Sequence, residues 1–367
     1  MPRILQIDRR LFGVTVGLCL IGAVMVFSSS AVVAREQYHN GYWFLMRQLV
    51  WLVLGLAGMY ALSNMDYKKL RQPKVIFTGL GLSFLMLLGV FFLDRTHQTH
   101  RWIRLGPLGI QPSELAKLVV ILYLAWFLEM RRRRREYGIN DVMNTLAPAF
   151  GPVLLLAGLV IAEPDLGTAL MILLVALMLF YVSGLSMRYL GYVALGALPF
   201  FYLFVVRVLY RWQRILSFLS PNADPQGHGF QLLQSLIAVG SGGLTGVGLM
   251  ESRQKLFYLP EAHTDFIFAV ISEELGYIGA IAVVALFAYY GWRGIRIALK
   301  APDEFGRLLA LGITTMVVGQ AMINLSVVLG LLPTKGISLP FISYGGSSLL
   351  VMLLATGVLL NISQHAD

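Results

Sequence analysis

The strongest constraint on this chain is a series of long apolar runs separated by polar segments. A helix crosses the roughly 30 Å hydrocarbon layer of a membrane in about 20 residues. Ten runs approach that length, at 11–34, 43–63, 74–93, 113–130, 145–162, 166–184, 188–207, 266–292, 306–330 and 346–361. Most are apolar on every side, so they would face lipid. In lipid the backbone groups must hydrogen-bond within the segment, and a helix achieves this. The sequence therefore predicts an all-α polytopic membrane protein with ten transmembrane helices.

Composition and charge agree with a membrane protein. Apolar residues make up 57% of the chain and charged residues 13%, against about 25% charged in ordinary soluble domains. The net charge of +10 comes from 29 Lys and Arg against 19 Asp and Glu. In membrane proteins such an excess lies in the short cytoplasmic loops, and here it is densest in the arginine run 131–135. We therefore expect both termini in the cytoplasm and no nucleic-acid partner.

One connection is much longer than the others. Residues 208–264 join the seventh and eighth spans, so they form a long extracytoplasmic loop within a single domain of residues 1–367. The loop contains an apolar stretch at 231–239, too short to span, and a glycine-rich stretch at 240–248. Loops of this length are usually functional, and we expect a re-entrant or interfacial segment. The glycines do not indicate a nucleotide site, because no strand precedes them and no Gly-Lys-Ser/Thr follows.

Charged residues gather near the outer ends of the spans. Because a charge within the membrane is energetically costly, each such residue is a candidate for a functional role. The candidates are the cations Arg101, Lys117, Arg253 and Lys255 and the acids Glu114, Glu163, Asp165, Glu261, Asp265, Glu273 and Glu274, together with His263. Structural explanations exist for several of them. Glu114 and Lys117 have the spacing of a helix ion pair, Glu163 and Asp165 suit a helix N-terminus, and His263 has no metal-motif spacing around it.

The mixture of cations and carboxylates indicates an outward-facing pocket at the edge of the bilayer. Cations at that depth suit a phosphate or diphosphate head group, and a nearby carboxylate can remove a proton from a hydroxyl. Outside a bacterial membrane there is no ATP, so a substrate there must carry its own leaving group, as a lipid diphosphate does. This chemistry alone leaves an enzyme and a transporter both open.

Several motifs resemble those of the SEDS family, which contains FtsW and RodA. They are RWIRLG at 101–106, QPSELAK at 111–117, EPDLGT at 163–168, YLPEAHTDFIFA at 258–269 with Glu273 and Glu274, and LPFISYGGSS at 339–348. The resemblance extends over residues 11–361. The stretches 42–48, 254–256 and 331–336 are more similar to the division branch, FtsW, than to RodA. One departure is Glu163, where many relatives carry Gln.

The resemblance implies a peptidoglycan glycosyltransferase. Such an enzyme polymerises lipid II, a disaccharide-pentapeptide on undecaprenyl diphosphate, on the outer face of the cytoplasmic membrane during septal wall synthesis. Its partners would be a class B penicillin-binding protein transpeptidase and other division-complex membrane proteins. Asp265 matches the family's essential acid and would be the general base. A lipid II flippase and a RodA-type elongation polymerase are the alternatives.

Further roles follow from charge and placement. Arg101, Lys117 and Lys255 would stabilise the leaving diphosphate, and Glu114 would hold Lys117. Glu261, His263 and Ser343 are the remaining candidates for substrate binding. No motif indicates a metal site or a cofactor, although a divalent cation such as Mg²⁺ or Mn²⁺ could accompany the diphosphate.

Overall fold

The computed structural model describes residues 7–93, 101–105, 108–134, 138–224, 227, 229–255 and 258–366. Its α-helices are α1 (Arg9–Tyr38), α2 (Trp43–Ser63), α3 (Pro73–Leu93), α4 (Pro112–Arg134), α5 (Ala147–Ala162), α6 (Leu166–Val182), α7 (Met187–Phe201), α8 (Leu209–Leu219), α9 (Phe230–Ser241), α10 (Ile267–Lys300), α11 (Glu304–Val328) and α12 (Gly346–His365). Short helical turns η1 (Tyr67–Arg71), η2 (Val142–Leu146), η3 (Tyr202–Val206) and η4 (Pro221–Ala223) accompany them.

The helices confirm a polytopic membrane protein. Among the described residues, eight helical stretches are long and apolar enough to cross a membrane: α1, α2, α3, η2 with α5, α7 with η3, α10, α11 and α12. Helix α6 is apolar but shorter, and α4 carries Glu114, Lys117 and Glu129 within its first 18 residues. Both coincide with expected spans. The predicted boundaries agree closely with most of these helices, because apolar length sets where a membrane helix ends.

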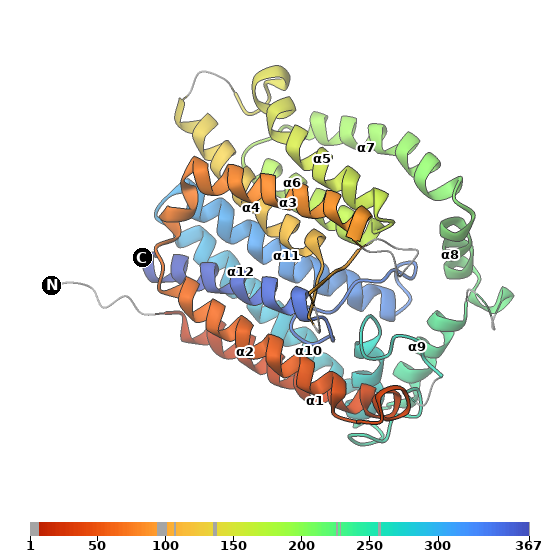
Figure 1. Ribbon diagram of the computed structural model, residues 1–367. Helices are drawn as coiled ribbons and strands as arrows, with labels where there is room; N and C mark the ends of the chain where they lie inside the picture. The colour runs from red at the N-terminus through yellow and green to blue at the C-terminus, as the bar shows by residue number, and fades with distance from the viewer. Residues whose placement is uncertain are drawn as a thin grey trace.

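The bundle has a buried centre and a lipid-like exterior. Helices α11 and α12 are the central ones, with 72% and 83% of their most apolar windows buried, whereas the window of α7 is entirely unburied. In Figure 1, α1 and α2 lie on one side of α10–α12, α3 to α6 lie on the other, and α7 and α8 run along the periphery. Exposed apolar side chains such as Leu195 and Phe200 are expected on helices that face lipid tails.

A small β-hairpin interrupts the helical pattern between α3 and α4. Strands β1 (Ile103–Leu105) and β2 (Leu108–Ile110) pair antiparallel, with Ile103 opposite Ile110. The sequence prediction of an all-α chain missed this hairpin, because two three-residue strands carry too little periodicity to be recognised. The hairpin contacts α12 through β2 and brings the preceding Arg101 and Trp102 to one end of the bundle.

The glycine-rich stretch packs against a break in α10. Gly276 has φ 66° and ψ −166°, a left-handed conformation that interrupts the helix. The backbone of Val247 donates to the carbonyl of Glu273 (3.0 Å), and the backbone of Tyr277 donates to Gly243 (2.9 Å). A Cβ on Gly246 would lie 2.1 Å from the Glu274 carbonyl oxygen. The glycines therefore allow two backbones to touch, and they leave the short half-helix 267–275 between this break and Asp265.

The long connection contains two helices of its own. Helix α8 has Arg211 and Arg214 on an otherwise largely apolar and aromatic segment, and the sequence analysis did not single it out. Helix α9 covers the expected short apolar stretch and packs against α10. Ser235 of α9 donates to the carbonyl of Val328 at the end of α11 (2.8 Å). Helix α9 therefore packs on this end of the bundle, whereas α8 runs along the periphery (Figure 1).

Candidate active site

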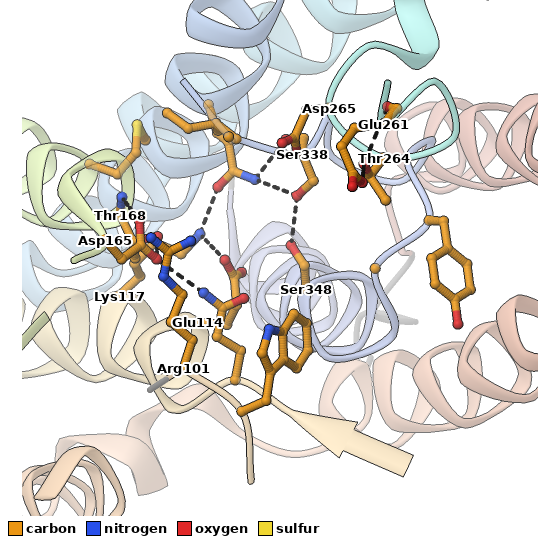
Figure 2. A pocket seen from close by; sticks show the side chains of 18 residues that line it. Arg101, Glu114, Lys117, Asp165, Thr168, Glu261, Thr264, Asp265, Ser338 and Ser348 are labelled. Atoms are coloured by element: carbon orange, nitrogen blue, oxygen red, sulfur yellow. Dashed lines mark hydrogen bonds and ion pairs between the residues drawn. The ribbon is translucent and has the colours of Figure 1, made fainter. Parts of the chain in front are cut away.

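A polar cavity of about 340 Å³ opens at the end of the bundle where α4, α6 and α11 meet the loops before α10 and α12. Figure 2 shows its walls. The charged lining residues are Arg101, Glu114, Lys117, Asp165, Glu261 and Asp265. The fold thus collects around one space charged residues that are as much as 164 positions apart in the chain, as Arg101 and Asp265 are.

Asp265 stands at the cavity wall two residues before α10. Its backbone carbonyl accepts a hydrogen bond from the Asn324 side-chain amide (2.7 Å), which also donates to the carbonyl of Ile337 (2.7 Å). A Cβ on Gly336 would lie 2.9 Å from Asp265 Oδ2. Asn324 therefore fixes the backbone of Asp265, and the absence of a side chain at Gly336 leaves room for the carboxylate.

The surroundings of Asp265 tune it towards a base that works near neutral pH. Burial, followed by the negative charges of Glu261 and Asp165, raises the pKa of Asp265 from 3.8 to about 7, against the opposing influence of Arg101 and Arg214. A general base is most effective when its pKa lies near the working pH. The carboxylate can therefore both hold and release a proton under physiological conditions.

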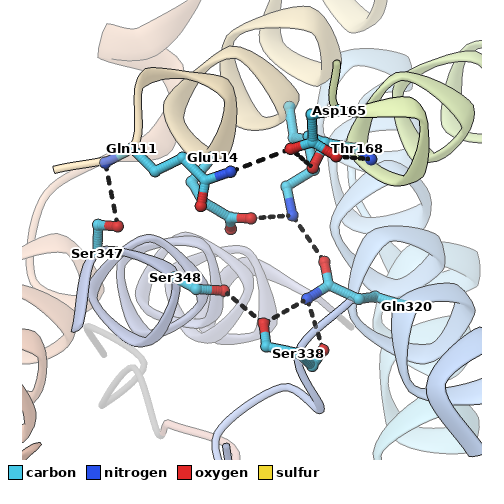
Figure 3. Close-up of polar contacts among 9 residues, drawn as sticks. Gln111, Glu114, Asp165, Thr168, Gln320, Ser338, Ser347 and Ser348 are labelled. Carbon is cyan, nitrogen blue, oxygen red and sulfur yellow. Dashed lines mark hydrogen bonds and ion pairs between the residues drawn. The ribbon is translucent and has the colours of Figure 1, made fainter. Parts of the chain in front are cut away.

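Lys117 is held on another wall of the cavity (Figure 2) by a fixed network, of which Figure 3 labels Glu114 and Gln320. Its ammonium group donates to Glu114 Oε1 (2.9 Å) and to Gln320 Oε1 (2.6 Å), and its side chain is 2% exposed. Gln320 in turn donates to the carbonyl of Ser338 (3.0 Å). An ammonium has three N–H donors, so one donor of Lys117 remains for a ligand in the cavity. The ion pair expected from the i,i+3 spacing is present.

Arg101 and Asp165 are both anchored on the short turn between α5 and α6. The Arg101 guanidinium donates to the carbonyl of Glu163 (3.2 Å) and to that of Pro164. Asp165 caps α6, accepting from the backbone and hydroxyl of Thr168 (3.1 and 2.8 Å), as its helix-start position suggests. It also accepts from Gln111 (3.1 Å), which ties the turn to the start of α4.

Glu163 has an unusual environment. Its side chain is fully buried, and neither carboxyl oxygen has a hydrogen-bond partner among the described residues. Burial and the charge of Asp165 raise the pKa of Glu163 to about 8, although Arg101 opposes them. Glu163 is therefore mainly protonated at neutral pH, and it does not line the cavity.

Three of the residues expected to bind substrate do not line the cavity. Lys255 forms an ion pair with Glu274 (3.0 Å) and is buried away from the lining. The ring of His263 packs on Phe44, with 4.6 Å between ring centroids, and burial lowers its pKa. Ser343 Oγ donates to the Thr264 carbonyl (2.6 Å) and accepts from a backbone amide in its own loop. His263 and Ser343 therefore contact other loop and helix residues near Asp265 and not the cavity.

Other lining residues were not singled out from the sequence. They include Gln111, Thr168, Gln320, Ser338 and Ser348. One signal was available: Gln320 and Asn324 are amides one helical turn apart in an apolar span, where unsatisfied polar groups are costly. Among the described residues, no three His, Cys, Asp or Glu side chains lie close enough together to hold a metal ion.

Comparison with known proteins assigns the chain. The profile of the FtsW/RodA/SpoVE family, described as a cell cycle protein, matches residues 9–367. The chain is 43% identical to a probable peptidoglycan glycosyltransferase FtsW of Geobacter metallireducens, covering 95% of this chain and 92% of the relative. It is 42% identical to stage V sporulation protein E of Bacillus subtilis, covering 98% and 97%.

Solved structures agree with this assignment. A chain of a peptidoglycan synthase complex, studied for how it coordinates polymerization and crosslinking, superposes with a TM-score of 0.79 at 32% identity, covering 99% of both chains. The rod shape determining protein RodA of Thermus thermophilus superposes with a TM-score of 0.70 at 29% identity, covering 100% of both. This chain therefore belongs to the SEDS family of FtsW, RodA and SpoVE.

Proposed function

We propose that this protein is a peptidoglycan glycosyltransferase that polymerises lipid II, with Asp265 as its general base. One observation carries the proposal: a carboxylate with a pKa of about 7 faces a cavity that is also lined by the cation Lys117. A base and a cation on different walls of one cavity suit a sugar hydroxyl and a diphosphate held between them. The match to curated glycosyltransferases over nearly the whole chain supports this chemistry.

The reaction balances with the residues present. Asp265 takes the proton from the 4-hydroxyl of the acceptor sugar, and that oxygen forms a bond to the anomeric carbon of the donor. The bond between this carbon and undecaprenyl diphosphate breaks, and the diphosphate leaves with the electron pair. Lys117 and Arg101 stabilise the charge that develops on it, because charge-assisted hydrogen bonds to phosphate oxygens are strong. Glu114 and Gln320 keep Lys117 in place.

The topology proposed for this activity is a single ten-helix unit of residues 1–367, with both termini in the cytoplasm. Helices α4 and α6 are proposed to bring the eight long apolar spans to ten, and the arginines at the end of α4 are proposed to mark its cytoplasmic end. Loop 208–264 and the cavity then face the outer side, where lipid II is presented. The cytoplasmic membrane at the division septum is the proposed location.

The proposed partner is a class B penicillin-binding protein, with other division-complex membrane proteins around the pair. The similarity to a chain of a complex that joins polymerization with crosslinking supports a transpeptidase partner. The higher identity to FtsW (43%) than to the RodA of Thermus thermophilus (29%) supports a septal role over an elongation role. Depletion in the native bacterium checks this choice, since filaments indicate division and loss of rod shape indicates elongation.

The decisive experiment is gel analysis of products formed from purified lipid II, with and without the class B partner. Wild-type protein yields glycan polymer, and Asp265→Asn yields none while remaining folded. Asp224→Asn, at an exposed loop position outside the cavity, is the matched control and retains activity. Undiminished polymer from Asp265→Asn rejects the general-base role. Protein-dependent movement of labelled lipid II across liposomes, without polymer, favours the flippase instead.

A further inference from the structure

A second cluster of buried charges lies outside the cavity, where the long loop meets α10. Glu274 is 1% exposed, and it accepts from Lys255 Nζ (3.0 Å) and from the hydroxyl of Ser28 on α1 (2.7 Å). The neighbouring Glu273, 3% exposed, accepts from the hydroxyl of Ser252 and from the backbone amide of Arg253 (3.1 Å). The two carboxylates therefore bind the loop segment 252–255 and join it to α1.

Charges buried this deeply must be compensated. Removing one partner of a buried ion pair leaves an unpaired charge in a medium of low dielectric constant, which is strongly unfavourable. Lys255 is 6% exposed and has Glu274 and Ser28 as its partners. The pair therefore holds the loop to the helix more firmly than an exposed ion pair could.

The cluster sits at the far end of the half-helix that begins next to Asp265. This half-helix, residues 267–275, ends at the break formed by Gly276. Its last residues carry the two carboxylates that bind segment 252–255, so its position depends on that contact. At about 1.5 Å per residue the half-helix is roughly 13 Å long, short enough to move as one rigid piece.

Backbone hydrogen bonds also hold the loop residues before Asp265. The backbone of Leu259 donates to the carbonyl of Gln254 (2.9 Å), and the backbone of Phe266 donates to the carbonyl of Glu261 (3.2 Å). One hydrogen bond thus links Gln254 to Leu259, and a second, between Glu261 and Phe266, closes a turn that contains Asp265. The described route from the Lys255–Glu274 pair to Asp265 runs along the half-helix, whose far end carries Glu274.

We propose that Lys255 and Glu274 are positioning residues that set the placement of the Asp265 carboxylate in the cavity. This reassigns Lys255 from the diphosphate to the scaffold of the base, and it rests on the proposed role of Asp265. The break at Gly276 separates the half-helix from the rest of α10, so the pair is one of the contacts that hold its end, beside the backbone bonds from the glycine-rich stretch. Without the pair, the half-helix and the loop would settle in other relative positions.

The test compares Lys255→Met with a matched variant that breaks another ion pair of α10. Arg293, beyond the break in α10, donates to Asp8 Oδ2 through Nε (3.0 Å), so Arg293→Gln also removes a partly buried ion pair. Two readouts are taken: the pH–rate profile of polymerisation from purified lipid II, and backbone hydrogen exchange over residues 258–266. Lys255→Arg, which keeps the charge, is the conservative rescue.

We expect Lys255→Met to lower kcat about 10- to 100-fold, the cost of misplacing a catalytic group by about 1 Å, with a smaller change in KM. The midpoint of the pH–rate profile moves, and exchange over 258–266 rises about tenfold. Lys255→Arg restores both, and Arg293→Gln changes neither even if it lowers thermal stability. A wild-type rate and exchange pattern in Lys255→Met overturns the proposal, and so does an equal loss in Arg293→Gln.

The two proposals fail separately. If the wild-type protein makes no polymer, the glycosyltransferase assignment fails, while hydrogen exchange still decides whether the pair holds the Asp265 segment. If polymer forms but Lys255→Met exchanges like the wild type, the positioning role fails and the assignment stands.

Discussion

The placement of Asp265 predicts that the inactive Asp265→Asn variant is more stable than the wild type. The environment raises the pKa of Asp265 from 3.8 to about 7. At about 1.36 kcal/mol per pH unit, ionising this carboxyl in the folded protein costs roughly 4 kcal/mol more than in the unfolded chain. Because the cavity gives it partial access to screening water, we expect about 2–4 kcal/mol to appear as stability.

The sign of the effect follows from proton binding. Between pH 3.8 and about 7, Asp265 is ionised in the unfolded chain but protonated in the folded protein. The folded state therefore binds more protons, and wild-type stability falls as pH rises through this range. The variant has no such titration. Its advantage is absent below about pH 4, grows up to about pH 7 and is constant above.

Thermal unfolding of purified protein between pH 4.5 and 8.5 measures this difference. We expect a higher midpoint for Asp265→Asn at pH 8, by several degrees, and nearly equal midpoints at the acidic end. Asp224→Asn should track the wild type at every pH, since that side chain is exposed. If Asp265→Asn is no more stable than the wild type at pH 8, or if its stability advantage does not change with pH, the pKa of Asp265 is not raised in the folded protein.

Two further predictions concern the surroundings of the base. Gly336→Ala should lower the polymerisation rate about 10- to 100-fold, because the new Cβ would lie 2.9 Å from Asp265 Oδ2 and displace the carboxylate. Gly81→Ala, where the added Cβ meets open space, is the control, and equal rates for the two variants would contradict the close approach of Gly336 to Asp265. The stability advantage of Glu163→Gln over the wild type should grow as pH rises from 4.5 to about 8. In this range Glu163 is ionised in the unfolded chain but protonated in the folded protein, where its pKa is about 8, so folding takes up a proton and becomes less favourable as pH rises. Unfolding midpoints that keep a constant difference across that range would contradict the environment described for Glu163.

Apolar length predicted the helices well because it depends on few residues at a time. The expected spans 43–63 and 74–93 agree with α2 and α3 within one residue at each end. Apolar length predicted neither α8, whose apolar residues are interrupted by Arg211 and Arg214, nor the break at Gly276. A glycine within an apolar run has no local sign that another backbone lies against it. Its conformation is determined by the packing of Gly243 and Gly246.

Charge placement predicted the candidate site in part. Asp265, Lys117, Glu114, Arg101 and Glu261 all line one cavity, as their positions at the outer ends of spans suggested. Their roles in catalysis remain predictions. The network that orients Lys117 was not foreseen, because its partner on α11 is about 200 residues away in the chain and pairs with it only after the helices pack.

Sequence alone was sufficient to predict that the chain spans a membrane, where most of its long apolar helices lie, and that charged residues gather near the ends of the spans. These properties follow from the cost of exposing polar groups to lipid, which each segment meets on its own. Only the tertiary structure decided which charges face one another. Lys117 and Lys255 are both buried cations, yet packing directs one to the cavity and the other onto Glu274. The direction of a side chain around its helix or loop depends on neighbours from distant segments, and no local pattern specifies them.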